Sequence, residues 1–258
     1  MSSLDKISDI GKKKVKALIQ ARLGSTRLPK KVFIEVLGKP LLLHLIERIR
    51  HSKYIDEVII LTTTNKKDDE LATFCLKHGI KFFRGNEEDV LDRYYQAAKL
   101  FKIDPVVRIT SDCPLIDPKV TDKVIEKFFA GNYDFVSTNN DADMTTDHLT
   151  WPDGLDTWAF SFDALERSWK EAKNKDDREH VTMHMVSNPD KFRLGFVDNK
   201  ENLFKKYRWT IDYPEDLEVI KAVFENLYRE DSIFHMEDII EFLKKYPKIQ
   251  EKNVKYIE

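Results

Sequence analysis

Residues 17–31, ALIQARLGSTRLPKK, contain the clearest structural signal in the chain. The apolar run that ends at Gln20 predicts a buried strand over residues 15–20, and a polar loop follows it at once. In open α/β sheets, ligands bind beyond the carboxyl ends of the strands. Gly24 can let the backbone approach a phosphate closely, and Ser25 and backbone N–H groups can donate to its oxygens. The stretch therefore predicts an anion-binding loop.

The charge of this loop supports the same interpretation. Arg22, Arg27 and Lys31 can neutralise a polyphosphate, and a guanidinium offers a planar fork to its oxygens. The loop matches neither G-x-x-x-x-G-K-[ST] nor G-x-G-x-x-G, which excludes the P-loop and the dinucleotide fingerprint. A solvated basic loop is the alternative. The pattern Arg-x-Gly-Ser-x-Arg directly after a strand favours binding over that alternative.

The rest of the first half alternates between two patterns. Strands are predicted over residues 57–63, 80–83, 105–110 and 133–137, and helices over residues 41–51, 68–78, 89–101 and 117–129. Such alternation predicts an α/β fold of Rossmann-like type, with a mostly parallel central sheet and helices on both faces.

The second half is less regular. Residues 151–160 are expected to form a loop that enters a strand, and strands are also predicted over residues 192–197 and 207–211. Helices are predicted over residues 161–172, 177–187, 214–227 and 236–245. The polar stretch 141–150 is long enough for a mobile loop. We expect one domain over residues 15–258, preceded by a flexible tail at residues 1–14.

Composition narrows the classes of function. The chain has 258 residues, 41% of them hydrophobic, and a formal net charge of -2, which gives no electrostatic case for a nucleic-acid or anionic-membrane partner. Two cysteines, Cys75 and Cys113, suggest no disulfide framework. No apolar run could span a bilayer, and the N-terminus lacks the apolar stretch of a secretory signal. A cytoplasmic location is therefore expected.

Two carboxylates follow predicted strands. Asp112 follows the strand at residues 105–110, and Asp212 follows the strand at residues 207–211. If these two ends meet at one edge of the sheet, the pair suits Mg²⁺, which prefers carboxylate, phosphate and water oxygens. The alternative is that each aspartate caps the helix after it, and Asp212 before Pro214 is a good helix start. Asp141-Ala142-Asp143 mimics a D-x-D motif, but we interpret it as a solvated loop pair.

Other polar groups have weaker signals. Trp151 could stack on a sugar and Asp153 or Asp156 could accept its hydroxyl hydrogen bonds, although Pro-Asp-Gly is also an ordinary turn. His180 and His184 share a helix face, but without a third ligand they are better interpreted as structural histidines.

Two groups of residues could contact a nucleotide base. The threonines at residues 62–64 end a predicted strand, where β-propensity alone would also place them. Arg84 and Gly85 precede an acidic helix start and could shape a base pocket.

The chain resembles the cytidylyltransferases that activate sugar acids, such as CMP-Kdo and CMP-sialate synthetases, and most of all their spore coat polysaccharide branch. The resemblance spans about residues 16–227. It rests on residues 20–31, 38–41 (GKPL), 87–95 (EEDVLDRYY), 108–116 (RITSDCPLI), 152–156 (PDGLD), 178–182 (REHVT) and 208–217 (RWTIDYPEDL). Gln20, Lys30 and Cys113 depart from the sugar-acid enzymes, which commonly have proline, glycine and an acidic residue there.

The resemblance implies a nucleotide-diphospho-sugar transferase fold, a homodimer, and Mg²⁺-dependent transfer of CMP from CTP to a sugar or sugar acid. Catalytic roles fall on Arg22, Arg27, Lys31 and Asp112, and Asp112 and Asp212 would hold the metal. The nucleotide would contact Ala21, Arg22, Leu23, Gly24, Ser25, Arg27, Lys31, Thr63, Thr64, Arg84, Arg108, Thr110 and Asp112. The acceptor would contact Asp153, Asp156, Arg178 and His180.

Two other functions are compatible with the same fold. An A-type glycosyltransferase would consume a nucleotide-sugar and release a nucleoside diphosphate. The loop at residues 22–31 argues against it, because a triphosphate requires more cationic charge than a diphosphate-sugar does. A non-catalytic nucleotide-binding protein is the second alternative, and the presence of both aspartates and the whole loop disfavours it.

Overall fold

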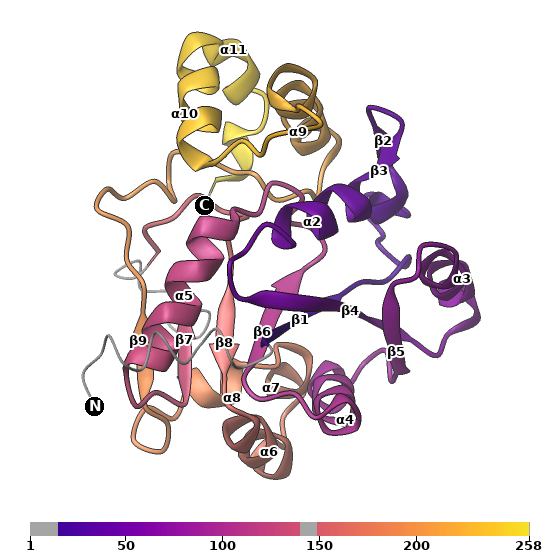
Figure 1. Ribbon diagram of the computed structural model, residues 1–258, viewed down its shortest axis with the longest axis vertical. Helices are drawn as coiled ribbons and strands as arrows, with labels where there is room; N and C mark the ends of the chain where they lie inside the picture. Colours follow the sequence, from indigo (N-terminus) through magenta and orange to yellow (C-terminus); the bar gives the residue numbers. More distant parts are fainter. Residues whose placement is uncertain (1–14, 140–148, 258) are drawn as a thin grey trace.

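The computed structural model describes residues 15–139 and 149–257, drawn in colour in Figure 1. The expected tail at residues 1–14 and the pair Asp141 and Asp143 lie outside the described residues, as does most of the predicted loop 141–150.

A seven-stranded sheet forms the centre of the molecule, in the order β5-β4-β1-β6-β8-β7-β9 (Figure 1). The strands are β1 (Val15–Gln20), β4 (Ile55–Thr63), β5 (Lys81–Gly85), β6 (Val106–Thr110), β7 (Phe135–Ser137), β8 (Trp158–Phe160) and β9 (Leu194–Phe196). The strands β1, β4, β5 and β6 run parallel, and β9 is parallel to β7, whereas β8 is antiparallel to both of its neighbours. The predicted α/β fold with a mostly parallel sheet is confirmed.

Helices cover both faces of this sheet. On one face lie α2 (Leu41–Ile49), α3 (Asp69–Lys77) and α5 (Pro118–Ala130), which share a core cluster with Ala17 and Ile19 of β1. On the other lie α4 (Val90–Phe101), α6 (Phe162–Glu171) and α8 (Met183–Val186), which pack with Leu18. These three β1 side chains are completely buried, and burial of an aliphatic side chain the size of leucine or isoleucine contributes about 1.5–3 kcal/mol.

A third core cluster lies beside the sheet, under α9 (Pro214–Leu227) and α10 (Met236–Lys245), which stand at the top of Figure 1. It includes Leu41, Leu155 and Trp209, so it joins α2 to the chain around residue 209. The short helices α7 (Lys175–Glu179) and α11 (Pro247–Gln250), the 3-10 turns η2 (Lys31–Phe33), η3 (Lys66–Asp68) and η5 (Val254–Tyr256), and the hairpin β2 (Glu35–Val36) and β3 (Lys39–Pro40) complete the described elements.

Two sequence predictions are wrong. Residues 207–211 form no strand, because their N–H groups are used by two different loops: Trp209 N donates to Asp153 O at 2.6 Å and Ile211 N donates to Asp112 O at 2.9 Å. The predicted helix 177–187 is interrupted between α7 and α8 at Val181, whose φ of 49° is left-handed and whose side chain is completely buried.

Two further features of the described residues concern the apolarity of the helices and the state of the cysteines. None of the helices in the described ranges combines the length and apolarity needed to cross a bilayer. Cys75 and Cys113 are both free thiols in the core.

Candidate active site at the carboxyl edge of the sheet

A polar pocket of about 810 Å³ opens where β1 and β6 end. Because β1 and β6 are parallel neighbours, with Gln20 paired to Thr110, the loops that leave them start side by side. The pocket is lined by Gln20, Ala21, Arg22, Gly24, Ser25, Thr26, Arg27, Lys31, Glu87, Glu88, Val90, Arg93, Arg108, Thr110, Ser111, Asp112, Lys175, Glu179, His180 and Asp212. Most of the residues that the sequence predicts to bind the nucleotide therefore lie around one cavity.

The loop after β1 forms one wall of this pocket. Its start follows the sheet, since Ala21 N donates to Leu61 O at 2.9 Å. Ser25 Oγ accepts from Leu28 N at 3.3 Å and closes the turn that brings Arg27 back to the pocket. Leu23 differs from its neighbours, because it is buried and its N–H donates to Asp68 Oδ1 at 2.7 Å. Leu23 therefore anchors the loop and does not line the cavity.

Lys31 lies at the centre of the charged groups. Its side chain is only 12% exposed, and Nζ lies 3.4 Å from Asp112 Oδ2, 3.0 Å from Asp212 Oδ1 and 2.8 Å from Ile211 O. Burial disfavours the ammonium, but the two carboxylates outweigh burial and raise the pKa of Lys31 above its usual value. The structure thus brings together the basic loop and both aspartates, although Asp212 reaches the site from an irregular segment and not from a strand end.

The two aspartates form a donor set that fits Mg²⁺. Burial opposes the Asp112 carboxylate, yet the charge of Lys31 keeps the pKa of Asp112 below its usual value, so the site holds ionised, hard oxygens. Both carboxylates already contact one cation, the Lys31 ammonium. Within the described residues, no group of three or more His, Cys, Asp or Glu side chains is placed to hold a metal. Two carboxylates are nevertheless enough for Mg²⁺, which takes its remaining ligands from phosphate and water.

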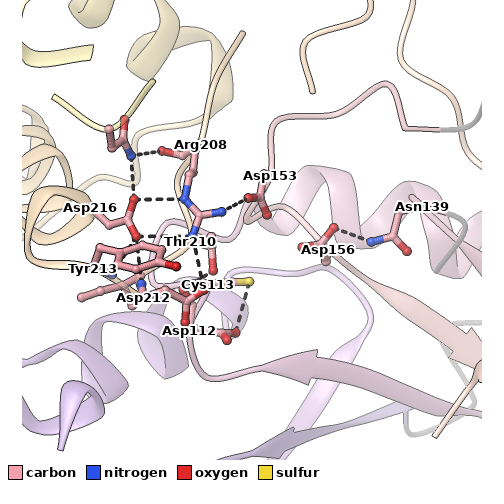
Figure 2. A network of polar contacts seen from close by, with 12 residues as sticks. Asp112, Cys113, Asn139, Asp153, Asp156, Arg208, Thr210, Asp212, Tyr213 and Asp216 are labelled. Atoms are coloured by element: carbon pink, nitrogen blue, oxygen red, sulfur yellow. Dashed lines mark hydrogen bonds and ion pairs between the residues drawn. The ribbon is translucent and has the colours of Figure 1, made fainter. Parts of the chain in front are cut away.

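Arg208 connects Asp212 to two further carboxylates, as Figure 2 shows. Its guanidinium lies 2.7 Å from Asp153 Oδ2, 3.2 Å from Asp212 Oδ2 and 3.1 Å from Asp216 Oδ1. Asp216 is completely buried and also accepts from the N–H groups of Asp212 and Tyr213, both at 2.9 Å. Sequence reasoning gives Arg208 no role, although its spacing of four residues from Asp212 is a signal that could have revealed the pair.

Gly154 allows the loop at residues 152–156, which contains the acceptor candidates Asp153 and Asp156, to approach this network. Its φ is 105°, and a Cβ atom there would lie 2.6 Å from the carbonyl carbon of Trp209. Only glycine permits both the backbone angle and the contact. Burial raises the pKa of the neighbouring Asp153 to about 6, and nearby carboxylates add to the effect against the opposing charge of Arg208. Asp153 lies in the network of Figure 2 but is not among the pocket-lining residues.

The helix α7 forms the opposite rim of the pocket. Lys175, Glu179 and His180 line the cavity, and His180 is the acceptor candidate that the structure does bring there. Arg178 points elsewhere: its Nε lies 3.0 Å from both oxygens of Asp89, at the start of α4, and its Nη1 donates to Trp169 O at 2.8 Å. Arg178 therefore fixes α7 against α4 and is not in the cavity.

His184 lies behind this rim, with its ring nitrogens 3.3 Å from Asp177 and 3.4 Å from Glu171. Its side chain is buried, and both ring nitrogens face these two carboxylates. This position agrees with the interpretation of His184 as a structural histidine.

Several other candidates lie outside the lining. Thr63 is buried with its hydroxyl on Asp68, and Thr64 N donates to Gly85 O at 2.9 Å. Arg84 Nε donates to Thr63 O at 2.8 Å and its Nη2 lies 2.7 Å from Asp69, so it braces the ends of β4 and β5. These three residues, predicted to contact the nucleotide, are not brought to the pocket.

Asp156 and Arg108 complete the sequence candidates. Asp156 accepts from Asn139 Nδ2 at 2.6 Å, away from the Arg208 network in Figure 2. Arg108 lines the pocket, with its guanidinium stacked 4.1 Å from the ring centre of Trp158. Arg108 is thus held against this ring while it borders the cavity.

Glu87 is a pocket residue that sequence reasoning misses, because its acidic run is interpreted only as a helix start. Its carboxylate lies 3.2 Å from Arg22 Nη1 and 2.7 Å from Lys67 Nζ, and it also accepts from Asn65. The hydrogen bond from Lys67 is the main reason that the pKa of Glu87 is lowered. Arg22 of the loop after β1 and Lys67 of η3 therefore share one anionic partner within the chain.

Comparison with known proteins gives the family. The cytidylyltransferase family model matches residues 16–258. An uncharacterized protein of Methanocaldococcus jannaschii is 37% identical over 243 residues, which cover 93% of this chain and 94% of that protein. The spore coat polysaccharide biosynthesis protein SpsF of Bacillus subtilis is 34% identical over 214 residues, which cover 81% of this chain and 85% of SpsF.

Solved structures show the same fold. A cytidylyltransferase from Leptospira borgpetersenii serovar Hardjo-bovis superimposes with a TM-score of 0.83 at 34% identity, covering 92% of this chain and 96% of that one. A CMP:2-keto-3-deoxy-manno-octonic acid synthetase in complex with CTP superimposes with a TM-score of 0.62 at 18% identity, covering 84% of this chain and 100% of that chain. At that identity the likeness is one of fold, and it confirms the nucleotide-diphospho-sugar transferase-like architecture.

Proposed function

The chain belongs to the cytidylyltransferase family, and from that membership we propose that it transfers CMP from CTP to a sugar or sugar-acid acceptor and releases pyrophosphate. One observation carries the proposal: Lys31 Nζ contacts Asp112 and Asp212 at 3.4 and 3.0 Å in the pocket that the Arg22–Arg27 loop borders. Cations for a triphosphate and carboxylates for a divalent metal thus meet in one cavity.

The geometry supports a task for each group. Arg22, Arg27 and backbone N–H groups of the loop bind the triphosphate of CTP, and Arg108 and Thr110 border its position from β6. Asp112 and Asp212 would hold Mg²⁺, which supplies compensation for the negative charge on the α-phosphate and the leaving pyrophosphate. Lys31 contributes a second positive charge at the same place. An acceptor oxygen attacks the α-phosphorus in line as pyrophosphate leaves, and alignment of such groups can supply about 7–11 kcal/mol.

The acceptor would enter from the side of α7 and the loop at residues 152–156. His180 lines the cavity there, and Asp153, which is not in the lining, binds the Arg208 guanidinium that also contacts the pocket residue Asp212. The relative SpsF is named a spore coat polysaccharide biosynthesis protein, and one protein of the same fold is named a CMP:2-keto-3-deoxy-manno-octonic acid synthetase. We therefore propose a sugar or sugar acid as acceptor and surface polysaccharide biosynthesis as the purpose.

The assay for this function measures pyrophosphate release from CTP with Mg²⁺ and a panel of sugar acids that includes 2-keto-3-deoxy-manno-octonic acid. Asp112→Asn removes one negative charge from the site, so we expect turnover to fall by about 100-fold or more while the protein stays folded. Asp163→Asn, a change at an exposed residue of α6, is the control and should leave the rate unchanged. Full turnover by Asp112→Asn would end the metal assignment.

Two further features belong to the proposal. The resemblance to the sugar-acid enzymes favours a homodimer, which light scattering on the purified protein tests. A mass of 30.4 kDa in solution, that of one chain, would contradict the dimer.

The composition and the two buried thiols favour a cytoplasmic location.

A further inference from the structure

Arg208 is not among the residues that line the pocket, yet it holds one that does. Asp212 offers its two oxygens to different partners: Oδ1 lies 3.0 Å from Lys31 Nζ and 3.1 Å from Arg27 Nη2, whereas Oδ2 lies 3.2 Å from Arg208 Nη2. The orientation of this carboxylate therefore depends on a contact from behind as well as on the pocket cations.

Asp212 needs such a contact because no sheet ladder fixes it. The residues before it, 207–211, form no strand, in contrast to those before Asp112, which belong to β6. The backbone at Asp212 is held instead by Asp216, which accepts its N–H at 2.9 Å. The side chain is held by Arg208, four residues earlier.

Arg208 can act as a rigid support because it has two anchors besides Asp212. Asp216 is completely buried and also accepts from Asn253 Nδ2 at 2.9 Å, so its position is fixed from several directions. Asp153 binds the other side of the guanidinium at 2.7 Å, and the Arg208 side chain is only 11% exposed. A planar fork held at both sides presents its remaining N–H group in one direction.

We propose that Arg208 is a positioning residue, which sets the Asp212 carboxylate for divalent metal binding by holding Oδ2 between the anchors Asp153 and Asp216. This inference rests on the proposed function. It assigns to Arg208 a task that neither the family membership nor the pocket lining gives it, and it gives a reason for the contacts in Figure 2 by which Arg208 joins Asp212 to Asp153 and Asp216.

If Arg208 were only a counter-charge, its loss would change divalent metal binding in the opposite direction from the loss of an orienting residue, so the two roles can be distinguished. Three cations, Arg27, Lys31 and Arg208, face the four carboxylates of Asp112, Asp153, Asp212 and Asp216. If Arg208 acted only as a counter-charge, its loss would leave more negative charge and tighten the binding of a divalent cation. If Arg208 orients Asp212, its loss weakens that binding. Arg208→Lys keeps the charge and removes only the fork.

The experiment measures the thermal shift that CTP causes at increasing free Mg²⁺, and takes the Mg²⁺ concentration that gives half of the shift. For Arg208→Lys we expect that concentration to rise by about tenfold, as is typical when a partner of a metal ligand is changed. Asp153→Glu keeps the charge but lengthens the side chain, so it displaces one anchor of the Arg208 fork and keeps the buried Asp216 contacts; charge alone predicts no change, whereas loss of orientation predicts a smaller rise in the Mg²⁺ midpoint. Asp153→Glu therefore gives the answer if Arg208→Lys does not fold.

Arg193→Lys is the matched control. Arg193 also places a fork on a buried aspartate, with Nε and Nη2 at 3.0 and 2.8 Å from Asp134, but neither residue lines the pocket. It should lower the melting temperature and leave the Mg²⁺ midpoint unchanged.

The outcomes separate this inference from the proposed function. A wild-type protein with no Mg²⁺-dependent CTP shift would overturn the proposed function and this inference with it. A normal wild-type shift with an unchanged or lower Mg²⁺ midpoint in the folded variants would overturn the inference alone.

Discussion

The exits of β1 and β6 and the segment around Asp212 both supply charged groups to the pocket, but they are held in different ways. Residues such as Arg22 and Asp112 follow strands whose hydrogen-bonded register fixes where each loop begins. Asp212 follows an irregular segment whose backbone bonds to two other loops, and Asp212 itself is held by side chains, chiefly those of Arg208 and Asp216. We call the loops after β1 and β6 the ladder-held region. We call the segment around Asp212, with the loop at residues 152–156 that packs against it, the network-held region. The ladder-held region should tolerate local changes that the network-held region does not.

The largest expected effect is at the place where the two regions meet. Lys31→Met removes the ammonium that touches both aspartates and a cation for the triphosphate, so kcat/KM should fall by about 100- to 1,000-fold. Steady-state pyrophosphate release measures the loss. Lys30→Met is the neighbouring control: Lys30 is paired with Glu70 at the surface and should matter little. Equal losses in the two variants would show that the contacts of Lys31 with Asp112 and Asp212 have no specific effect on turnover.

A glycine in the network-held region gives the next largest effect. Gly154→Ala meets both a left-handed φ of 105° and a contact of 2.6 Å with the Trp209 backbone. We expect the free energy of unfolding to fall by about 3 kcal/mol, from denaturant melts, because backbone strain and overpacking add. The Mg²⁺ midpoint should also rise, since Asp153 is displaced. A stable Gly154→Ala protein with normal turnover would remove the contrast between the regions.

A remote ion pair gives a smaller effect and a pH signature. Asp134 is held by Arg193, whose hydrogen bonds lower the pKa of Asp134. Asp134→Asn should cost about 1–2 kcal/mol of unfolding free energy at pH 7, since Arg193 is half-exposed.

The sign of the pH dependence follows from that lowered pKa. The folded state favours the carboxylate, so its contribution is fully present above the unfolded pKa of about 3.9 and is lost as the pH falls through the folded pKa. Melts of wild type and variant should therefore converge in acid. A constant difference between pH 7 and pH 3 would contradict this account, and turnover at pH 7 should be unchanged.

The smallest expected effect is at the glycine of the ladder-held region. A Cβ at Gly24 would meet only side-chain atoms, the nearest being the flexible end of Lys67, at 2.7 Å from Nζ, and its φ is not left-handed. Gly24→Ala should therefore change the free energy of unfolding by less than about 0.5 kcal/mol. Any loss should appear in the affinity for CTP, measured by titration calorimetry. A destabilisation as large as that of Gly154→Ala would break the comparison.

The same division explains what the sequence could predict. Apart from the short hairpin β2–β3 and the 3-10 turns, the strands and helices up to β7 follow hydrophobic periodicity, and the sequence patterns predict them within a few residues. The basic loop and Asp112 follow from their positions after strands. The sequence assigns Arg178 to the acceptor, but Arg178 binds Asp89, because residue type alone does not show which of several acidic partners an arginine meets. The break at Val181 and the irregular path through Trp209 depend on tertiary contacts that local propensity does not encode.

The position of Glu87 has a consequence for the strength of ligand binding. A polyphosphate that reaches Arg22 and Lys67 competes with a carboxylate that belongs to the chain and already neutralises them. Its binding free energy is then the difference between two sets of ion pairs and not the full value of the new one. Under the proposed function, an exchange of this kind would limit the affinity for nucleotide and give Arg22 and Lys67 a partner to return to when pyrophosphate departs.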